Sequence, residues 1–361
     1  MLMEGASGTR YGEEMTIPIA NDKAIDRSNL PKIPGLAFRQ FRGEGDYASM
    51  VAVTNASHVE DGIQEAVILE EVIKDYSPRD KFDPYTDMVL VEVGGDLVGF
   101  SEVTWRRDLD ENWMGWHTAY LLPEWRRKGI GRAMLDWNES RITEIAAEQE
   151  SNVIGGSYFQ VFSQDTAVGR NALIQQAGYA TVRFFYAMQR IDLQDLPEAP
   201  LPGGVSMRPV EPQHMRAIWD AKNEAFRDHW GYGQRSEDDY VRWLEDPYND
   251  LSLWQVAWAR AEDGGEESVV GMALNFIYPE DNARFSFLRG EVRTLGVLRS
   301  CRRRGLGRAL LVRSMHALRE CGMTEVVLEV DTDNLTGALR LYEGVGFRTL
   351  SRDAIYRKPI T

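Results

Sequence analysis

The stretch RRRGLGRALL, Arg302–Leu311, decides how the rest of this sequence is interpreted. It stands between a predicted strand that ends near Val297 and a predicted helix that begins immediately after the turn. Glycines at Gly305 and Gly307 let successive backbone N–H groups converge on one concavity, and the positive end of the helix dipole adds to their attraction for anions. The turn therefore predicts a phosphate site.

Taken alone, a glycine-rich turn with solvated arginines would be an equally good interpretation. The pattern recurs, however, in the first half of the chain as RRKGIGRAML, Arg126–Leu135. A Walker loop would need GK[ST], and a dinucleotide fingerprint would need a small third residue where Leu310 and Met134 stand. We therefore expect a phosphate ligand other than a nucleoside triphosphate or NAD.

The recurrence extends outward from the turn to two halves of the chain. The first half contains LAFRQF (36–41), VLVEVGGDLVGFSEV (89–103) and LIQQAGY (173–179), and the second contains VSMRPV (205–210), SVVGMALNF (268–276) and LYEGVGF (341–347). The segment DLPEAPLPGG between them cannot continue a helix or a central strand. We predict an N-terminal extension (1–34), a first domain (35–194), a linker (195–204) and a second domain (205–361).

Each half has the element order of a mixed α/β domain, with a strand, helices, a hairpin, a strand, the turn, a long helix, a strand, a short helix and a strand. In the second half the strand ending near Val297 and the run VVLEV (326–330) flank a helix. That helix carries Leu311, Met315 and Leu318 on one stripe, which is typical of a βαβ unit.

Composition limits the partners. The formal net charge of −15 repels nucleic-acid phosphate. It hints at cationic small acceptors, although solubility is the simpler explanation. Cys301 and Cys321 lack CxxC spacing, so neither a disulfide framework nor a metal site is indicated. No run approaches the roughly 20 apolar residues of a membrane helix. We expect a cytoplasmic monomer or homodimer that binds neither nucleic acid nor membrane.

The turn R-x-x-G-x-G opening a helix, followed by VDTDN (330–334) and A-x-x-LYExxGF (338–347), resembles the GNAT superfamily of acyl-CoA N-acyltransferases. The resemblance implies two tandem GNAT-type domains, each a mixed, mostly antiparallel sheet flanked by helices with a splayed strand pair for CoA. It implies acetyl-CoA as co-substrate and a small-molecule or peptide amine as acceptor. Within the superfamily the layout resembles the mycothiol synthases, which acetylate a cysteinyl-glucosaminyl-inositol.

The resemblance also assigns residues to the cofactor. Around the pyrophosphate it places Arg302, Arg304, Gly305, Gly307 and Arg308. Along the pantetheine arm it places the main chain of Leu295, Val297 and Leu298 and the side chain of Asn334. In the first half the matching turn would consist of Arg126, Gly129 and Gly131. Cys301, beside the turn, is expected to be an unreactive thiol.

Direct acyl transfer requires a neutral amine, a stabilised oxyanion and a proton for the departing thiolate. The resemblance places Tyr342 beside the CoA sulfur, where a phenol with an ordinary pKa of about 10 can donate that proton. Glu291 stands at the distance from the turn at which several GNAT enzymes carry a catalytic glutamate. Its ordinary pKa of about 4.3 makes it a weak base unless burial raises the pKa or water relays the proton. The alternatives are a surface salt bridge for Glu291 and packing under the sheet for Tyr342.

The first half is predicted to be catalytically silent. Alignment on the turn and on LIQQAGY places Gly115, Ile174 and Thr166 where the second half has Glu291, Tyr342 and Asn334. Such a half could still bind CoA, and His117 and Tyr120 are the residues that could substitute in catalysis.

The acceptor pocket is expected to come from the first helices of the second half. Candidate residues are Glu224, Asp228, His229, Trp230 and Tyr232, with His229 as an alternative base. A protein that binds acetyl-CoA without catalysis is the competing interpretation, because a fold alone does not guarantee activity. Retention of both Glu291 and Tyr342 argues against it.

Overall fold

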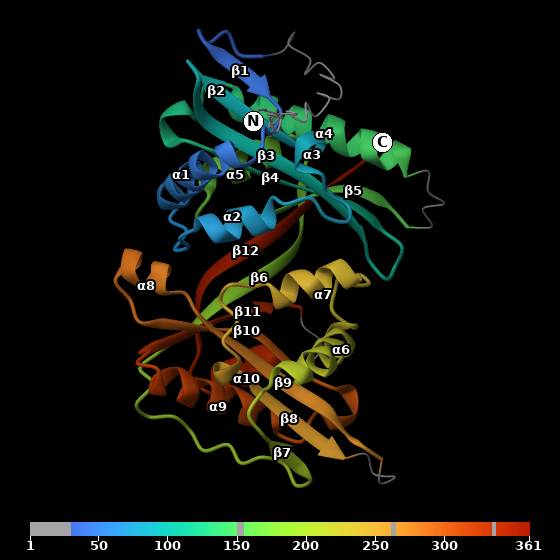
Figure 1. Cartoon of the computed structure of the whole chain (residues 1–361), viewed down its shortest axis with the longest axis vertical. Coiled ribbons are helices and arrows are strands. Elements are labelled where there is room, and N and C mark those ends of the chain that lie inside the picture. The colour runs from blue at the N-terminus through green and yellow to red at the C-terminus, as the bar shows by residue number, and fades with distance from the viewer. Residues whose placement is uncertain (1–29, 150–154, 261–264, 334–336) are drawn as a thin grey trace, which may run out of the picture.

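The computed structural model describes residues 30–149, 155–260, 265–333 and 337–361 (Figure 1). The first half contains, in chain order, β1 (Leu36–Arg39), α1 (Glu44–Glu60), α2 (Leu69–Asp75), α3 (Pro84–Asp87), β2 (Met88–Val93), β3 (Asp96–Arg107), β4 (Trp113–Leu121), the 3-10 turn η2 (Pro123–Trp125), α4 (Ile130–Glu148), β5 (Ser157–Gln164), α5 (Val168–Gln176) and β6 (Ala180–Ile191).

The second half largely repeats this order, with helix α8 added between β9 and β10. It contains β7 (Val205–Met207), η3 (Pro212–His214), α6 (Met215–Phe226), α7 (Glu237–Leu244), η4 (Leu251–Leu253), β8 (Gln255–Arg260), β9 (Glu267–Ile277), α8 (Pro279–Phe285), β10 (Arg289–Val297), η5 (Arg299–Cys301), α9 (Leu306–Glu320), β11 (Glu325–Asp331), α10 (Ala338–Gly344) and β12 (Arg348–Pro359). Within the described residues, none of these helices is long and apolar enough for a membrane crossing.

One sheet runs through both halves. Among the described residues it has 12 strands in the order β1-β2-β3-β4-β5-β12-β6-β11-β10-β9-β8-β7. The last strand of each half pairs with the other half, because β12 is antiparallel to β5 and β6 is antiparallel to β11. Strands β6 and β12 also pair with each other and cross the middle of the molecule in Figure 1. The halves therefore exchange their final strands.

This exchange was not expected, since the sequence pattern predicts one central sheet for each half. The mixed α/β class, with a mostly antiparallel sheet flanked by helices, is confirmed. The domain boundaries stay a prediction. Strand β6 ends at Ile191 and β7 begins at Val205, so the predicted linker carries no described strand.

Helices α6 and α9 cover opposite faces of the second-half sheet. The core beside α9 contains Ala257 and Ala273, whereas the core beside α6 contains their chain neighbours Val256 and Met272. Successive strand residues point to opposite faces, so the two cores lie on the two sides of β8 and β9. We refer to these sides as the α6 face and the α9 face.

Candidate active site

In each half the two parallel strands next to the turn separate after a short paired stretch. Strand β10 pairs with β11 over Arg289–Glu291, and β4 pairs with β5 over Trp113–Trp116. Beyond these ranges no pairing joins the described parts of either strand pair, although β10 continues to Val297 and β4 to Leu121. The splayed strand pair that the sequence resemblance implies is present twice.

The glycine-rich turn has the same backbone conformation in both halves. Gly305 and Gly129 are the N-caps of α9 and α4, with φ of 85° and 88°. Both lie in the left-handed region, which glycine enters without strain. The first N–H groups of a helix have no partner inside the helix, so each turn presents unsatisfied donors to an anion.

The two turns differ in what covers them. A Cβ added at Gly305 would meet no described atom within 4 Å, whereas one at Gly129 would lie 3.1 Å from Cγ of Pro31. At Gly307 an added Cβ would lie 3.5 Å from Cδ2 of Leu341 and 3.8 Å from Cγ2 of Val297. The second-half turn is therefore open at its N-cap and adjoins both the end of β10 and the helix that carries Tyr342.

The first arginine of each turn points into the protein. The Nε–H of Arg302 donates to the carbonyl of Val297 at 2.9 Å, and its guanidinium also donates to the carbonyl of Ala225 at 2.9 Å. Likewise the Nε–H of Arg126 donates to the carbonyl of Leu121 at 3.2 Å. These side chains hold the strand end against the preceding helix, and the pyrophosphate contact that the resemblance implies for them stays a prediction.

Exposed guanidinium groups beside the open turn come from Arg304 and Arg308, which donate to the carbonyls of Gly203 and Gly344, each at 3.3 Å. Their roles and those of Gly305 and Gly307 remain predictions. Asn334, the predicted pantetheine contact, lies outside the described residues. The two cysteines, Cys301 and Cys321, are free thiols.

A β-bulge in β10 determines which face Glu291 occupies. Pairing with β9 shifts register between Val292 and Thr294. Before the bulge, Glu291 lies opposite Phe276 of the α6 core, and after it Leu295 lies opposite Ala273 of the α9 core. In a regular strand residues 291 and 295 would share one face. The bulge therefore puts the carboxylate and the predicted pantetheine contact on opposite sides of the sheet.

The bulge also corrects the sequence alignment of the two halves. Strand β4 pairs with β3 without a register shift, so β10 has one extra residue. A Cβ on Gly115 would clash with Ile142 of α4 at 2.2 Å, just as one on Gly290 would clash with Leu318 of α9 at 2.6 Å. The first-half counterpart of Glu291 is therefore Trp116, not Gly115, and an indole still cannot accept a proton from an amine.

Glu291 has the protonation behaviour that a base needs. Burial raises its pKa to about 7, and the charges of Glu329 and Glu65 act in the same direction. Arg293 and a hydrogen bond to Tyr278 oppose this rise. A carboxylate with a pKa near the working pH is substantially ionised and basic enough to take a proton from an ammonium group.

Tyr342 lies on the α9 side, in the same hydrophobic cluster as the side chains of Leu295 and Val297. It is 6% exposed, and its ring centroid lies 6.2 Å from that of Phe347. Burial raises the pKa of its phenol to about 12, so the hydroxyl keeps its proton at neutral pH. It can therefore serve as a donor.

Comparison with known proteins identifies the family. The model of the acetyltransferase (GNAT) family matches residues 58–160 and 215–347, which is more than half of the chain. The chain belongs to the GNAT acetyltransferase family. The sequence resemblance, with two tandem GNAT domains, is confirmed, and the protein is an acetyl-CoA-dependent acyltransferase.

The relatives include mycothiol acetyltransferases. That of Pseudarthrobacter chlorophenolicus is 29% identical over 78% of each chain, and that of Thermomonospora curvata is 32% identical over 66% of this chain and 71% of its own. Among solved structures, a GCN5-related N-acetyltransferase from Sphaerobacter thermophilus has a TM-score of 0.66 at 25% identity, covering 91% of this chain and 96% of its own. A tandem GNAT protein from the clavulanic acid biosynthesis pathway shares the fold, with a TM-score of 0.60 at 15% identity over 90% and 98% of the two chains.

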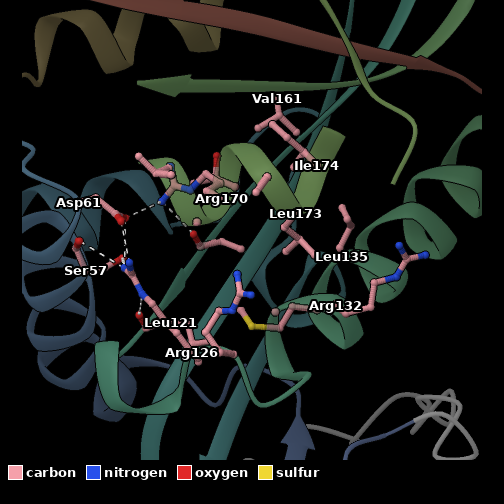
Figure 2. A pocket seen from close by; sticks show the side chains of 18 of the residues that line it. Ser57, Asp61, Leu121, Arg126, Arg132, Leu135, Val161, Arg170, Leu173 and Ile174 are labelled. Carbon is pink, nitrogen blue, oxygen red and sulfur yellow. Dashed lines mark hydrogen bonds and ion pairs between the residues drawn. The ribbon is translucent and has the colours of Figure 1, made fainter. Parts of the chain in front are cut away.

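The first GNAT domain encloses a cavity of about 690 Å³ between its splayed strands (Figure 2). Gly129, Gly131, Thr166 and Ile174 are among the lining residues. Arg170 reaches into this region, where it donates to the carbonyl of Ala119 on β4 at 3.2 Å. Figure 2 shows Arg170 and Arg126 converging on Asp61. Their guanidinium nitrogens lie 4.0 and 2.6 Å, respectively, from the carboxylate oxygens of Asp61. Protein groups thus occupy part of the edge that a pantetheine arm would use.

His117 and Tyr120, the residues of the first half that could substitute in catalysis, make contacts inside the protein. His117 lines the cavity, but burial lowers its pKa to about 3, and its Nε2 is 2.8 Å from the hydroxyl of Tyr179. Tyr120 packs on Phe100 with ring centroids 5.1 Å apart, and burial raises its pKa above the ordinary value. Neither group titrates near neutral pH, and the catalytic silence of the first half stays a prediction.

The predicted acceptor loop of the second GNAT domain mainly joins the two halves. Trp230 stacks under Arg183 and Arg357, 5.5 and 4.4 Å from its ring centroid, and the carbonyl of Tyr232 accepts from the N–H of Leu109 at 3.0 Å. The remaining predicted residues have local partners. Asp228 pairs with Arg302, Glu224 with Arg227, and His229 packs on Phe226.

Proposed function

We propose that this GNAT enzyme transfers an acetyl group from acetyl-CoA directly to a primary amine of a small molecule or peptide, in its second domain. The observation that carries the proposal is Glu291. Its carboxylate, with a pKa of about 7, lies where β10 leaves β11 and faces away from the predicted CoA side. The open turn at Gly305 supports the same assignment.

The cofactor would lie along the splayed strands. First-turn N–H groups of α9, at Gly305 and Gly307, would bind the pyrophosphate, with Arg304 and Arg308 adding positive charge. The free edge of β10 at Leu295 would hydrogen-bond to the pantetheine arm. Asn334 would add a side-chain hydrogen bond to the same arm.

Catalysis would then use one proton acceptor and one proton donor. Glu291 takes a proton from the ammonium form of the acceptor, and the freed amine attacks the thioester carbonyl carbon. The C–S bond of the tetrahedral intermediate breaks as the amide forms, Tyr342 gives its proton to the departing thiolate, and the second proton that leaves the amine nitrogen returns through solvent to the Tyr342 phenolate. Acetyl-CoA and amine become amide and CoA with no covalent enzyme intermediate.

A mycothiol-type acceptor is the second candidate, because the relatives at 29% and 32% identity are mycothiol acetyltransferases. The resemblance of the sequence to mycothiol synthases points the same way. The acceptor would then be a cysteinyl-glucosaminyl-inositol, whose cysteinyl amine would meet Glu291.

Acetyl-CoA is expected to raise the melting temperature of the protein. A ligand that binds only the folded state stabilises it by RT ln(1 + [L]/Kd), which is roughly 2.7 kcal/mol at a hundredfold excess over Kd. A thermal scan at saturating acetyl-CoA measures the shift, with NADH and ATP as controls. A shift with either control and none with acetyl-CoA would sink the assignment of the cofactor.

Turnover is expected with at least one primary amine. The purified protein, acetyl-CoA and a panel of amines are mixed, and the release of free CoA is followed with a thiol reagent. The panel contains cysteinyl-glucosaminyl-inositol, peptides, aminoglycosides and polyamines, so it separates the two candidates. Stabilisation by acetyl-CoA without CoA release on any acceptor would favour a non-catalytic acetyl-CoA-binding protein instead.

A further inference from the structure

Carboxylates gather on the α6 face beside Glu291, where the two halves meet. Glu291 lies opposite Val327 of β11, so Glu329, two residues further along, projects to the same face. The burial pattern of β11 agrees, because Val326, Leu328 and Val330 are buried and the residues between them are accessible.

Two further carboxylates complete the group. Asp353 of β12 lies opposite Phe185 of β6, which lies opposite Asp331 of β11, so Asp353 shares the face of Glu329. Glu65, from the loop between α1 and α2 of the first half, hydrogen-bonds to Gln164 and adds its charge to the environment of Glu291. We call Glu65, Glu291, Glu329 and Asp353 the carboxylate cluster.

An unpartnered buried oxygen in the cluster points to a ligand. Asp353 is 1% exposed, and its Oδ1 has no hydrogen-bond partner among the described residues. Leaving a buried carboxylate oxygen unpaired is costly, so such a group implies a partner that is supplied when the site is in use. Glu65 and Glu329 lie among other protein atoms that desolvate their carboxylates, but both side chains keep part of their surface exposed, so the cluster can be reached from outside.

The four residues of the cluster are all acidic, and Arg293 supplies positive charge that opposes the rise in pKa at Glu65 and Glu291. Burial raises the pKa of Glu329 and Asp353 to about 7, and the charge of Glu65 adds to both shifts. Arg293 opposes the rise at Glu329, but it is paired with Asp246 at 3.1 Å. The next carboxylate along β11, Asp331, is neutralised by Arg183 at 2.8 Å and is not part of the cluster.

The corresponding face of the first half carries the opposite charge. Around Trp116, the counterpart of Glu291, the guanidinium of Arg106 stacks at 4.3 Å, and Arg357 lies opposite Gln160, the strand neighbour of Trp116. The negative charge is therefore a property of the second site and not of the fold that both halves share.

The spacing of the carboxylates favours a ligand with separated positive charges. Paired strands lie about 4.8 Å apart and rise about 3.3 Å per residue, so the Cα atoms of Glu291 and Glu329 are separated by at least about 8 Å, because β11 leaves β10 after Val327. Among the described residues no three acidic, histidine or cysteine side chains converge closely enough to hold one metal ion. A short aliphatic chain with an ammonium group at each end spans such a distance.

We propose that the acceptor is a diamine or polyamine, which presents its reacting amine to Glu291 and a second ammonium group to Glu329, with Asp353 and Glu65 adding negative charge around it. This rests on the proposed function and names the substrate class of that site. It also predicts that acceptors with a single amine are poorer substrates than diamines. Glu329 acts here as a specificity residue that binds the far end of the acceptor.

The test compares alkane diamines, from diaminopropane to diaminohexane, with the monoamines of equal chain length. For wild type, kcat/KM with the best diamine should exceed that of its matched monoamine by about tenfold or more, the factor that corresponds to about 1.4 kcal/mol. Glu329→Gln should remove this preference by raising KM for the diamine alone, whereas any change in kcat from the lost Glu329 charge near Glu291 should be shared by the diamine and the monoamine. Glu320→Gln, an exposed carboxylate at the end of α9, is the matched control and should change neither.

A binding measurement keeps this test independent of turnover. Isothermal titration of the diamine into wild type with CoA present should give binding that Glu329→Gln weakens by about tenfold. Equal kcat/KM for diamines and monoamines in wild type, or an equal loss for both in Glu329→Gln, would overturn the proposal. So would the absence of diamine binding. Diamine binding without CoA release would instead contradict the proposed function and leave the cluster as a diamine site.

Discussion

Gly305→Glu is expected to abolish turnover, by at least about a hundredfold, whereas Gly129→Glu should leave kcat nearly unchanged. A carboxylate at Gly305 would occupy the N-terminus of α9 and repel the pyrophosphate from the N–H groups that bind it. The magnitude is that of losing a well-placed group of oxyanion-type donors. Gly129 has nearly the same φ, so backbone strain is matched between the two variants.

Steady-state kinetics with saturating acceptor and varied acetyl-CoA give kcat, and KM for acetyl-CoA, of both variants. Thermal scans without ligand show whether each is folded, and Gly305→Ala separates the strain of a Cβ at positive φ from the effect of charge. Full activity of Gly305→Glu together with loss of activity in Gly129→Glu would show that the active site lies in the first half.

Glu291→Gln is expected to lower kcat by about 10²–10⁴-fold, the usual contribution of a positioned proton acceptor. The pKa of about 7 for Glu291 sets the pH dependence. Wild-type kcat should rise as Glu291 loses its proton and level off above about pH 7. The variant depends on amine that is already free, so its kcat should keep rising towards the pKa of the acceptor. The loss is therefore largest at and below pH 7.

The companion variant Tyr342→Phe should lower kcat with little change in CoA affinity, because the hydroxyl acts once charge develops on sulfur. Because the pKa of the Tyr342 phenol is about 12, its ionisation does not change the pH dependence of kcat near neutral pH. A profile of kcat against pH for wild type and both variants measures these effects. Full activity of both variants on a true acceptor would refute the assigned roles.

Part of the candidate site follows from local sequence, and part depends on contacts that local sequence does not contain. The turn around Gly305 was predictable because its pattern of arginines and glycines recurs around Gly129, in each case at the start of a helix. The inward position of Arg302 was not, since it depends on the carbonyl of Ala225, far away in the chain. The counterpart of Glu291 was misplaced by one residue, because a bulge is visible only in the pairing of β10 with β9.

By itself the sequence determined the family, the repeated α/β order and the residue types at the predicted catalytic positions, because these depend on short patterns with strong backbone requirements. Only the tertiary structure decided that β6 and β12 exchange between the halves, since both strands can pair with either neighbour and the choice rests on long-range packing. It also decided the pKa of Glu291. That value depends on burial and on charges brought close by the fold, among them Glu65 from the other half.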